Sequence, residues 1–202
     1  DSFLLKLQEL GMMDITRSDR PIDQNSKEMV EISSRYKSAI SELKRGMKVY
    51  EKIEAVPVAV SDDLLLQTLE EVFAAKSESV AARAQLIRDI QESEVWGEFS
   101  YEDIARLNGI GFQPHFFAVS NKRYQQSWEE EYPLQILNTT PNKVYFTIVF
   151  PVGEELAFPI PEAAFPEKPA SVLREELKAT EAKIEECQKI LAGYAKEIER
   201  IQ

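Results

Sequence analysis

The sequence predicts an α+β protein in which a long antiparallel coiled coil carries a small α+β head at its tip, with a partial second lobe at the N-terminus. In 62–95 and 171–202, apolar residues recur at alternating steps of three and four, as in helices that pack along one another. Between these segments the chain alternates apolar and polar residues, which is typical of β-strands. We therefore expect four parts, namely a partial proximal lobe over 1–25, long helices over 26–95, a head over 96–170 and a returning helix over 171–202.

The N-terminal residues predict an incomplete lobe. FLLKLQEL predicts a short helix over 2–10 that Gly11 ends, and MMDIT predicts a strand over 12–16. One helix and one strand cannot bury their own apolar faces, so we expect them to lie against the following helix or against another copy of the chain. Because the chain starts at Asp1 within an amphipathic pattern, we expect it to be a fragment of a longer protein.

Three long helices are expected next. The first, over 27–54, carries a heptad repeat from Tyr36 to Tyr50, and Pro57 ends it. The second, over 62–95, begins at the N-cap Ser61 and carries two acidic residues, Asp62 and Asp63, in its first turn. Two cations, Lys76 and Arg83, interrupt its apolar seam. The seam positions are Leu66, Leu69, Phe73, Lys76, Val80, Arg83, Ile87 and Ile90. The third, over 171–202, has the most regular repeat and includes Cys187.

The head is expected to begin where the second helix stops. Gly97 suits the left-handed conformation that closes a helix, and Trp96 is placed to pack under the head. Ser100 and Asp103 form a capping-box variant that predicts a helix over 100–108. The rest of the head predicts a small antiparallel sheet covered by short helices, with strands over 112–120, 132–138 and 142–150, a helix over 121–131, and a proline-rich crossing over 151–169 with room for one more edge strand.

Composition and residue types exclude several functions. The chain of 202 residues has 24 basic and 35 acidic residues, and a net charge of −11 disfavours nucleic acid as a partner. The one cysteine allows no internal disulfide, which indicates a reducing compartment. The only histidine, His115, is expected to be a half-buried strand residue with a hydrogen-bonded ring, and Cys187 a small core residue. We therefore expect no catalytic site, metal site or cofactor.

A partner surface is predicted in the segment NKRYQQSWEEE. If it is helical, Tyr124 and Trp128 share one face, and Lys122 and Arg123 lie within two turns of them. Aromatic residues and arginine often anchor interfaces. Two other interpretations stay open. Both aromatic residues could simply cover the sheet, or only the basic residues could reach solvent and meet an acidic partner helix.

The order of these features resembles the cytoplasmic N-terminal region of the V-type ATPase subunit I, called subunit a in eukaryotes. The resemblance is carried by the opening FLLKLQELGMMDIT, the strand VYFTIVF, and the block that follows the long helix, which is Trp96, Gly97, Asp103, Ile104, Leu107, Gly109, Ile110 and Phe112. It extends over essentially the whole chain. The family's first strand and its membrane half, with the arginine of the ion path, have no counterpart here.

The resemblance implies a non-catalytic stator part of a rotary ATPase or ATP synthase, at the cytoplasmic face of the membrane. It implies that the lobes bind the peripheral-stalk subunits and that the membrane half of the full-length chain meets the rotor ring, so that proton or sodium transport is coupled to ATP. No cofactor is implied, and the fragment could self-associate. The alternatives are a coiled-coil adaptor or tethering protein with an inserted α+β head, and a substrate-gripping arm of a synthetase, which the acidic charge disfavours.

Overall fold

The computed structural model describes residues 24–58 and 64–201, with side chains described up to residue 197. The chain divides into two compact units, of which the first comprises Asp1–Glu71 and Lys189–Gln202 and the second comprises Val72–Gln188. The boundary between them falls within two helices, α3 (Leu65–Glu94) and α6 (Ala170–Ile201). The helix expected over 2–10, the strand expected over 12–16, and the cap at 61–63 all lie outside the described residues.

The described part of the first unit consists of helices and an irregular segment over residues 51–58. Helix α2 (Gln24–Tyr50) buries Ala39, Leu43 and Tyr50. It ends at Tyr50 and not at residue 54 as the sequence predicts, because the chain leaves the helix to lie along α6, where the Val56 amide donates to the carbonyl oxygen of Lys189 at 3.3 Å. The close approach also explains one glycine, since a Cβ atom at Gly193 would lie 2.3 Å from the Val56 carbonyl oxygen.

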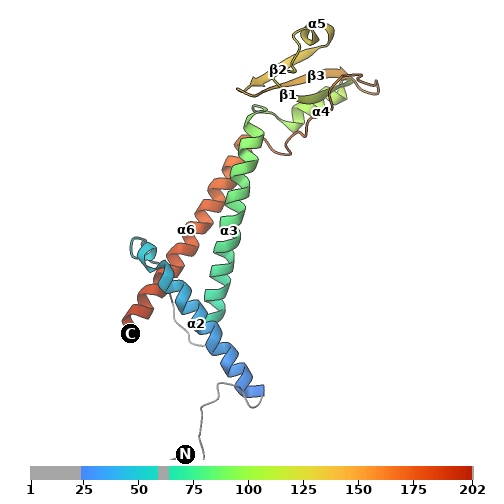
Figure 1. The fold of residues 1–202 in the computed structure, drawn as a ribbon. Helices are drawn as coiled ribbons and strands as arrows, with labels where there is room; N and C mark the ends of the chain where they lie inside the picture. The colour runs from blue at the N-terminus through green and yellow to red at the C-terminus, as the bar shows by residue number, and fades with distance from the viewer. Residues whose placement is uncertain (1–23, 59–63, 202) are drawn as a thin grey trace, which may run out of the picture. The chain divides into compact units, whose positions relative to one another are not determined.

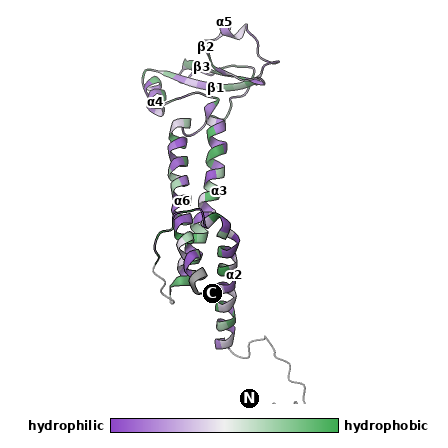
Figure 2. Ribbon diagram, turned by 90° about the vertical axis from the view of Figure 1, so that its left-hand side faces the viewer, coloured by the Kyte–Doolittle hydropathy of each residue, from purple (hydrophilic) through white to green (hydrophobic). Residues whose placement is uncertain are grey.

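Ion pairs join α3 and α6 within the second unit. Arg83 donates to Glu181 at 2.8 Å, and Arg174 donates to Glu94 at 2.5 Å. Because the partners follow one another in opposite order along the two helices, the helices are antiparallel, and they lie side by side in Figures 1 and 2. The predicted apolar seam is interrupted between them, since Val80 is 48% exposed, whereas Ile90 is 8% exposed.

The second unit contains a three-stranded antiparallel sheet, which confirms the predicted α+β class. Strands β1 (Phe112–Ser120), β2 (Leu134–Thr139) and β3 (Lys143–Pro151) lie in the order β1-β3-β2. The first strand has the predicted bounds, and the other two begin or end within two residues of them. β1 and β3 pair over nine residues without a shift, from Phe112 opposite Pro151 to Ser120 opposite Lys143, whereas β2 carries a register shift between Ile136 and Asn138.

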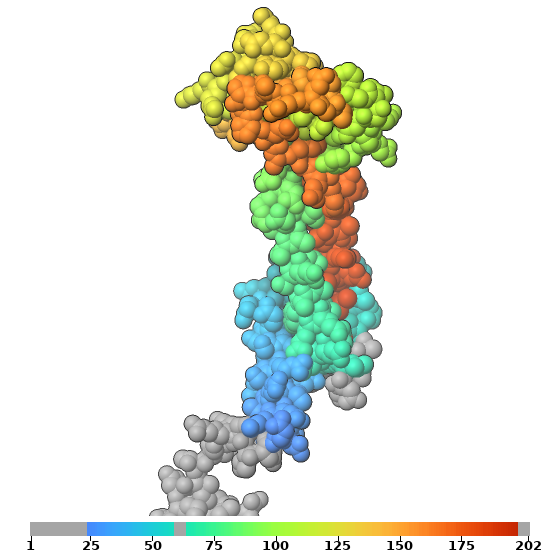
Figure 3. All heavy atoms as spheres, turned by 90° about the vertical axis from the view of Figure 1, so that its right-hand side faces the viewer, coloured from blue at the N-terminus to red at the C-terminus, as the bar shows by residue number. Residues whose placement is uncertain are grey.

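Each face of the sheet packs against a different part of the chain. One face forms the core of the unit with α5 (Trp128–Glu131), and its buried residues are Phe117, Val119, Trp128, Val144, Phe146 and Ile148. The other face presents Phe116 and Tyr145, and the Trp96 ring contacts both at centroid distances of 5.9 and 5.1 Å. In Figure 3 the orange atoms of the segment after β3 lie against the yellow-green atoms of α4 (Tyr101–Gly109).

Three local expectations need correction. The helix predicted over 121–131 is only α5, because the amides of Arg123 and Tyr124 both turn back to the Ser120 carbonyl oxygen. The Asn121 side chain also donates to the carbonyl oxygens of residues 140 and 141, which fixes this segment as a turn against the β2–β3 connection. The capping box is incomplete as well, since Ser100 accepts from the Glu102 amide but the Asp103 carboxylate pairs with Arg106.

The third correction concerns the proline-rich crossing. No strand is assigned in residues 152–169, all of which the structure describes. The segment makes one backbone hydrogen bond to the edge of β1, from the Ala163 amide to the Phe116 carbonyl oxygen at 2.8 Å. Prolines at 159, 161, 166 and 169 lack the amide that a longer ladder needs.

Candidate functional site

His115 and Cys187, the side chains with catalytic potential, each lie in the surroundings expected of a structural residue. His115 lies in β1 with its side chain 14% exposed, and its Nδ1 atom is 2.8 Å from Glu162 Oε1, which confirms the expected half-buried, hydrogen-bonded ring. Cys187 is a free thiol whose pKa is raised, chiefly by burial and further by the nearby Glu186 carboxylate. Among the described residues, no group of three or more His, Cys, Asp and Glu side chains could hold a metal ion.

Of the two aromatic residues of the predicted partner surface, Trp128 belongs to the core of the second unit and Tyr124 packs against that core, partly buried. Trp128 is 5% exposed and packs against Phe158 at a centroid distance of 5.1 Å. Tyr124 packs edge-on against Trp128, and its hydroxyl donates to Glu129 at 3.0 Å. Burial, together with this hydrogen bond, raises the pKa of Tyr124 to about 12. The two rings therefore cover the sheet, which is the first of the alternatives that the sequence left open.

The basic residues of the same segment are exposed, and the sheet adds a third cation to them. Ser120 lies opposite Lys143 in the β1–β3 register, and the Asn121 amide donates to the Asn142 carbonyl oxygen at 3.1 Å. Lys122 and Arg123, which follow Asn121, are thus held at the same end of the sheet as Lys143. We call these three residues, Lys122, Arg123 and Lys143, the basic corner.

The basic corner differs from the other cations of residues 96–170. Arg106 pairs with Asp103, and Lys168 pairs with Glu176 at 2.5 Å. Within the part of the chain that the structure describes, no ion pair is recorded for Lys122, Arg123 or Lys143. The sequence alone did not indicate that Lys143 belongs to this surface, because Lys143 comes near Lys122 and Arg123 only when β1 pairs with β3. The similar length and aromatic content of 112–120 and 142–150 are the signals that could have suggested this pairing.

The predicted junction residues lie where α3 ends. Gly97 has a φ of +76°, so the expected left-handed conformation is confirmed. Trp96 is 6% exposed, and its ring contacts Phe165 at 5.4 Å in addition to the two sheet residues described above. The Phe165 ring in turn stacks on Phe116 at a centroid distance of 3.7 Å. Trp96 is therefore a packing residue that fixes the end of α3 under the sheet.

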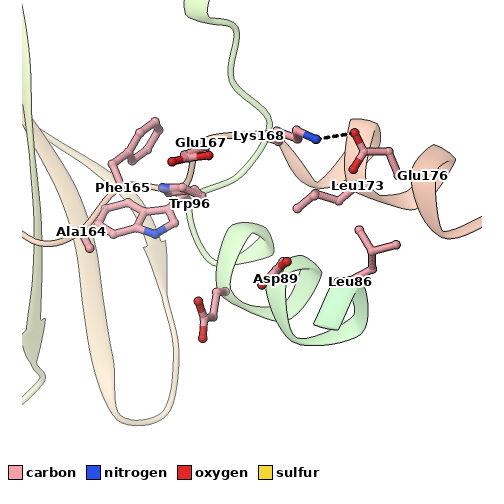
Figure 4. A pocket seen from close by; sticks show the side chains of 11 residues that line it. Leu86, Asp89, Trp96, Ala164, Phe165, Glu167, Lys168, Leu173 and Glu176 are labelled. Carbon is pink, nitrogen blue, oxygen red and sulfur yellow. Dashed lines mark hydrogen bonds and ion pairs between the residues drawn. The ribbon is translucent and has the colours of Figure 1, made fainter. Parts of the chain in front are cut away.

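A cavity of about 400 Å³ lies beside this junction. Figure 4 shows the rings of Trp96 and Phe165 near one another, with Leu86 and Leu173 reaching in from the two helices. Ala164 and Pro166 add to the apolar lining. Its polar lining is mostly acidic, and its charged residues are Asp89, Glu92, Glu167, Lys168 and Glu176. No signal in the sequence identified this cavity, because its walls come from three segments that the fold brings together.

No helix in the described part of the chain is long and apolar enough to span a bilayer. No protein-family model, curated protein or solved structure matches this chain with significant similarity.

Proposed function

We propose that this chain is a non-catalytic stator part of a rotary V-type ATPase or ATP synthase, and that its head binds an acidic surface of a peripheral-stalk subunit through the basic corner. The observation that carries the proposal is the junction at Trp96. In the resembling family a Trp-Gly block follows a long helix, and here Trp96 fastens the end of α3 beneath a sheet while Gly97 redirects the chain. Such a joint can transmit force from helix to sheet because the Trp96 ring packs directly against sheet residues.

The second part of the proposal is that α3 and α6 form an antiparallel coiled-coil shaft. The ion pairs Arg83–Glu181 and Arg174–Glu94 support it, as do the buried seam residues Leu173 and Ile90. Spin labels on cysteines introduced at the exposed positions Ala82 and Ala182, in a Cys187→Ser background, test this pairing. One narrow distance distribution is expected, and a broad distribution would mean that the two helices do not form a fixed pair.

The basic corner supports an acidic partner. Its three cations are exposed and lack recorded ion pairs in the described part of the chain, in a protein whose net charge is −11. An isolated positive region on an acidic protein directs an acidic surface to one place and repels it elsewhere. Trp128 is 5% exposed, so its ring offers little contact area to a partner at this surface.

Binding to purified peripheral-stalk subunits tests the proposed function. We expect each of Lys122→Ala, Arg123→Ala and Lys143→Ala to weaken binding by about two- to fivefold at low salt, because exposed ion pairs contribute about 0.2–1 kcal/mol. Arg106→Gln is the matched control, since it removes an exposed cation of the same unit that already has an acidic partner. No binding by the unaltered chain would contradict the stator function. Binding that all four variants leave unchanged would contradict only the basic corner.

The adaptor alternative has its own test. The coding sequence beyond Gln202 should contain several long apolar segments if the chain belongs to an ATPase. A soluble domain in that position would favour an adaptor or tethering protein instead.

A further inference from the structure

The cavity beside Trp96 has the wrong charge for an anion and the wrong lining for a small ion. Four carboxylates and one ammonium group line it, so its formal charge is strongly negative. The ammonium group of Lys168 is already bound to Glu176 at 2.5 Å, as the dashed line in Figure 4 marks. The remaining carboxylates therefore dominate the electrostatic potential inside the cavity.

Two of these carboxylates are not used by the fold. Asp89 accepts a hydrogen bond of 2.6 Å from Gln85. For Glu92 and Glu167, in contrast, no hydrogen bond or ion pair is recorded within the described residues, and both side chains are exposed. They come from different elements, one from the last turns of α3 and the other from the crossing that precedes α6. Each can therefore accept hydrogen bonds from a ligand without breaking a contact of the protein.

The walls select among cationic ligands. No described set of three acidic, histidine or cysteine side chains is arranged to hold a metal ion, which disfavours a divalent cation. The cavity is far larger than one ion, and aromatic and aliphatic side chains form much of its surface. A ligand that fills it must combine a positive charge with an apolar stem. Guanidinium groups suit this setting, because they are weakly hydrated, stack on aromatic rings and bind carboxylates through paired hydrogen bonds.

We propose that this cavity receives an arginine side chain of a partner protein. The guanidinium group binds the carboxylates of Glu92 and Glu167, and the methylene stem lies against Trp96 and Phe165. Its volume of about 400 Å³ falls in the range of pockets that enclose a ligand group. This inference does not depend on the stator function, because it concerns the opposite face of the sheet from the Trp128 core and a partner of opposite charge to that of the basic corner.

A titration with blocked tripeptides tests the proposal. The probes are acetyl-Gly-Arg-Gly-amide and the same peptide with citrulline, which has nearly the same shape as arginine but no charge. The two tryptophan indole N–H signals in ¹⁵N-labelled protein report binding, since Trp96 lines the cavity and Trp128 lies in the core on the other face of the sheet. We expect the arginine peptide to shift the Trp96 signal alone, with an affinity at least about tenfold better than that of the citrulline peptide.

Substitutions of Glu92 and Glu167 test whether these carboxylates bind the arginine peptide. Glu92→Gln and Glu167→Gln should each weaken the arginine peptide by about threefold or more, because each removes one charged acceptor. Glu130→Gln, an exposed change on α5, should leave its affinity unchanged. An unmoved Trp96 signal at the solubility limit of the peptide, equal shifts with citrulline, or equal affinities in all three variants would each overturn the proposal. Competition by millimolar magnesium or calcium would also overturn it, in favour of a cation site.

Discussion

The hydroxyl group of Ser93 donates a hydrogen bond to the backbone carbonyl oxygen of Lys168, at a distance of 2.9 Å. Ser93 is fully buried in the last turn of α3, and it is the one buried polar side chain among the described residues. The bond links two segments 75 residues apart and satisfies a carbonyl group at the point where the chain enters α6. It therefore fastens the outgoing helix to the start of the returning one.

Loss of this hydroxyl should destabilise the second unit. We expect Ser93→Ala to lower the free energy of unfolding by about 0.5–1.5 kcal/mol, because the part-buried hydrogen bond to the Lys168 carbonyl is lost. Urea denaturation followed by circular dichroism measures the change. Ser171→Ala, at an exposed serine of α6, is the control and should have little effect. Equal stability of the two variants would mean that water replaces the hydroxyl at no cost.

The left-handed conformation at Gly97 predicts a conformational cost for any side chain. A Cβ atom added at this residue would have no other atom within 4 Å, so the cost of Gly97→Ala is backbone strain alone, about 1–2 kcal/mol. Gly109→Ala is the matched control, since it is equally open but lies within α4 without a positive φ. Thermal denaturation should show a lower midpoint for the first variant and no decrease for the second. A neutral Gly97→Ala would show that the turn can change its backbone conformation.

Because Trp128 is buried and the basic residues of the 121–131 segment are exposed, substitutions in this segment should differ in their effect on stability. Trp128→Ala should lower the free energy of unfolding by about 3–5 kcal/mol, as truncation of a large core aromatic does. Lys122→Ala and Arg123→Ala are exposed changes and should stay within about 0.5 kcal/mol of the unaltered chain. Urea denaturation of the three variants makes the comparison. A Trp128→Ala variant of normal stability would contradict the core position of this ring.

The raised pKa of Tyr124 predicts a loss of stability at high pH. Its ordinary value is 10, and in the folded protein it is about 12, chiefly because the phenol is partly buried. The folded state therefore keeps a proton that the unfolded state releases, so this contribution is complete below pH 10 and is lost as the pH rises toward 12. Tyr124→Phe should reduce the fall in stability across this interval. Phenolate absorbance should also show one fewer late-titrating tyrosine, and an unchanged titration curve would contradict the assignment.

The close contact at Gly193 predicts a clash in the first unit. A Cβ atom there would lie 2.3 Å from the Val56 carbonyl oxygen and 3.1 Å from the Val58 side chain. Gly193→Ala should therefore cost about 1–3 kcal/mol, as overpacking does, and should displace the chain that hydrogen-bonds to Lys189. The double variant Gly193→Ala, Val58→Ala should recover little of the lost free energy of unfolding in urea denaturation, because the contact with the Val56 backbone remains. Full recovery would mean that the side chain of Val58 causes the clash.

The sequence by itself determined the elements of this protein and several of its local contacts. Heptad spacing predicts the long helices, alternation predicts β1 with its observed bounds, and Ser100 and Gly97 predict the start of one helix and the end of another. These features depend on interactions between residues that are near in the chain, such as a hydroxyl group capping an amide two residues later. Local rules of backbone geometry and periodicity are therefore sufficient to predict them.

Only the tertiary structure decided which of the predicted surfaces remain exposed. The helical pattern of 121–131 gives way to a turn because Asn121 bonds to residues about twenty positions later, and this change places Trp128 in the core. Strand order brings Lys143 to Lys122 and Arg123, and the crossing at Phe165 closes a cavity against Trp96 and Leu86. Each of these outcomes depends on contacts between distant segments, whose pairing is set by the packing of the whole sheet and not by any local pattern.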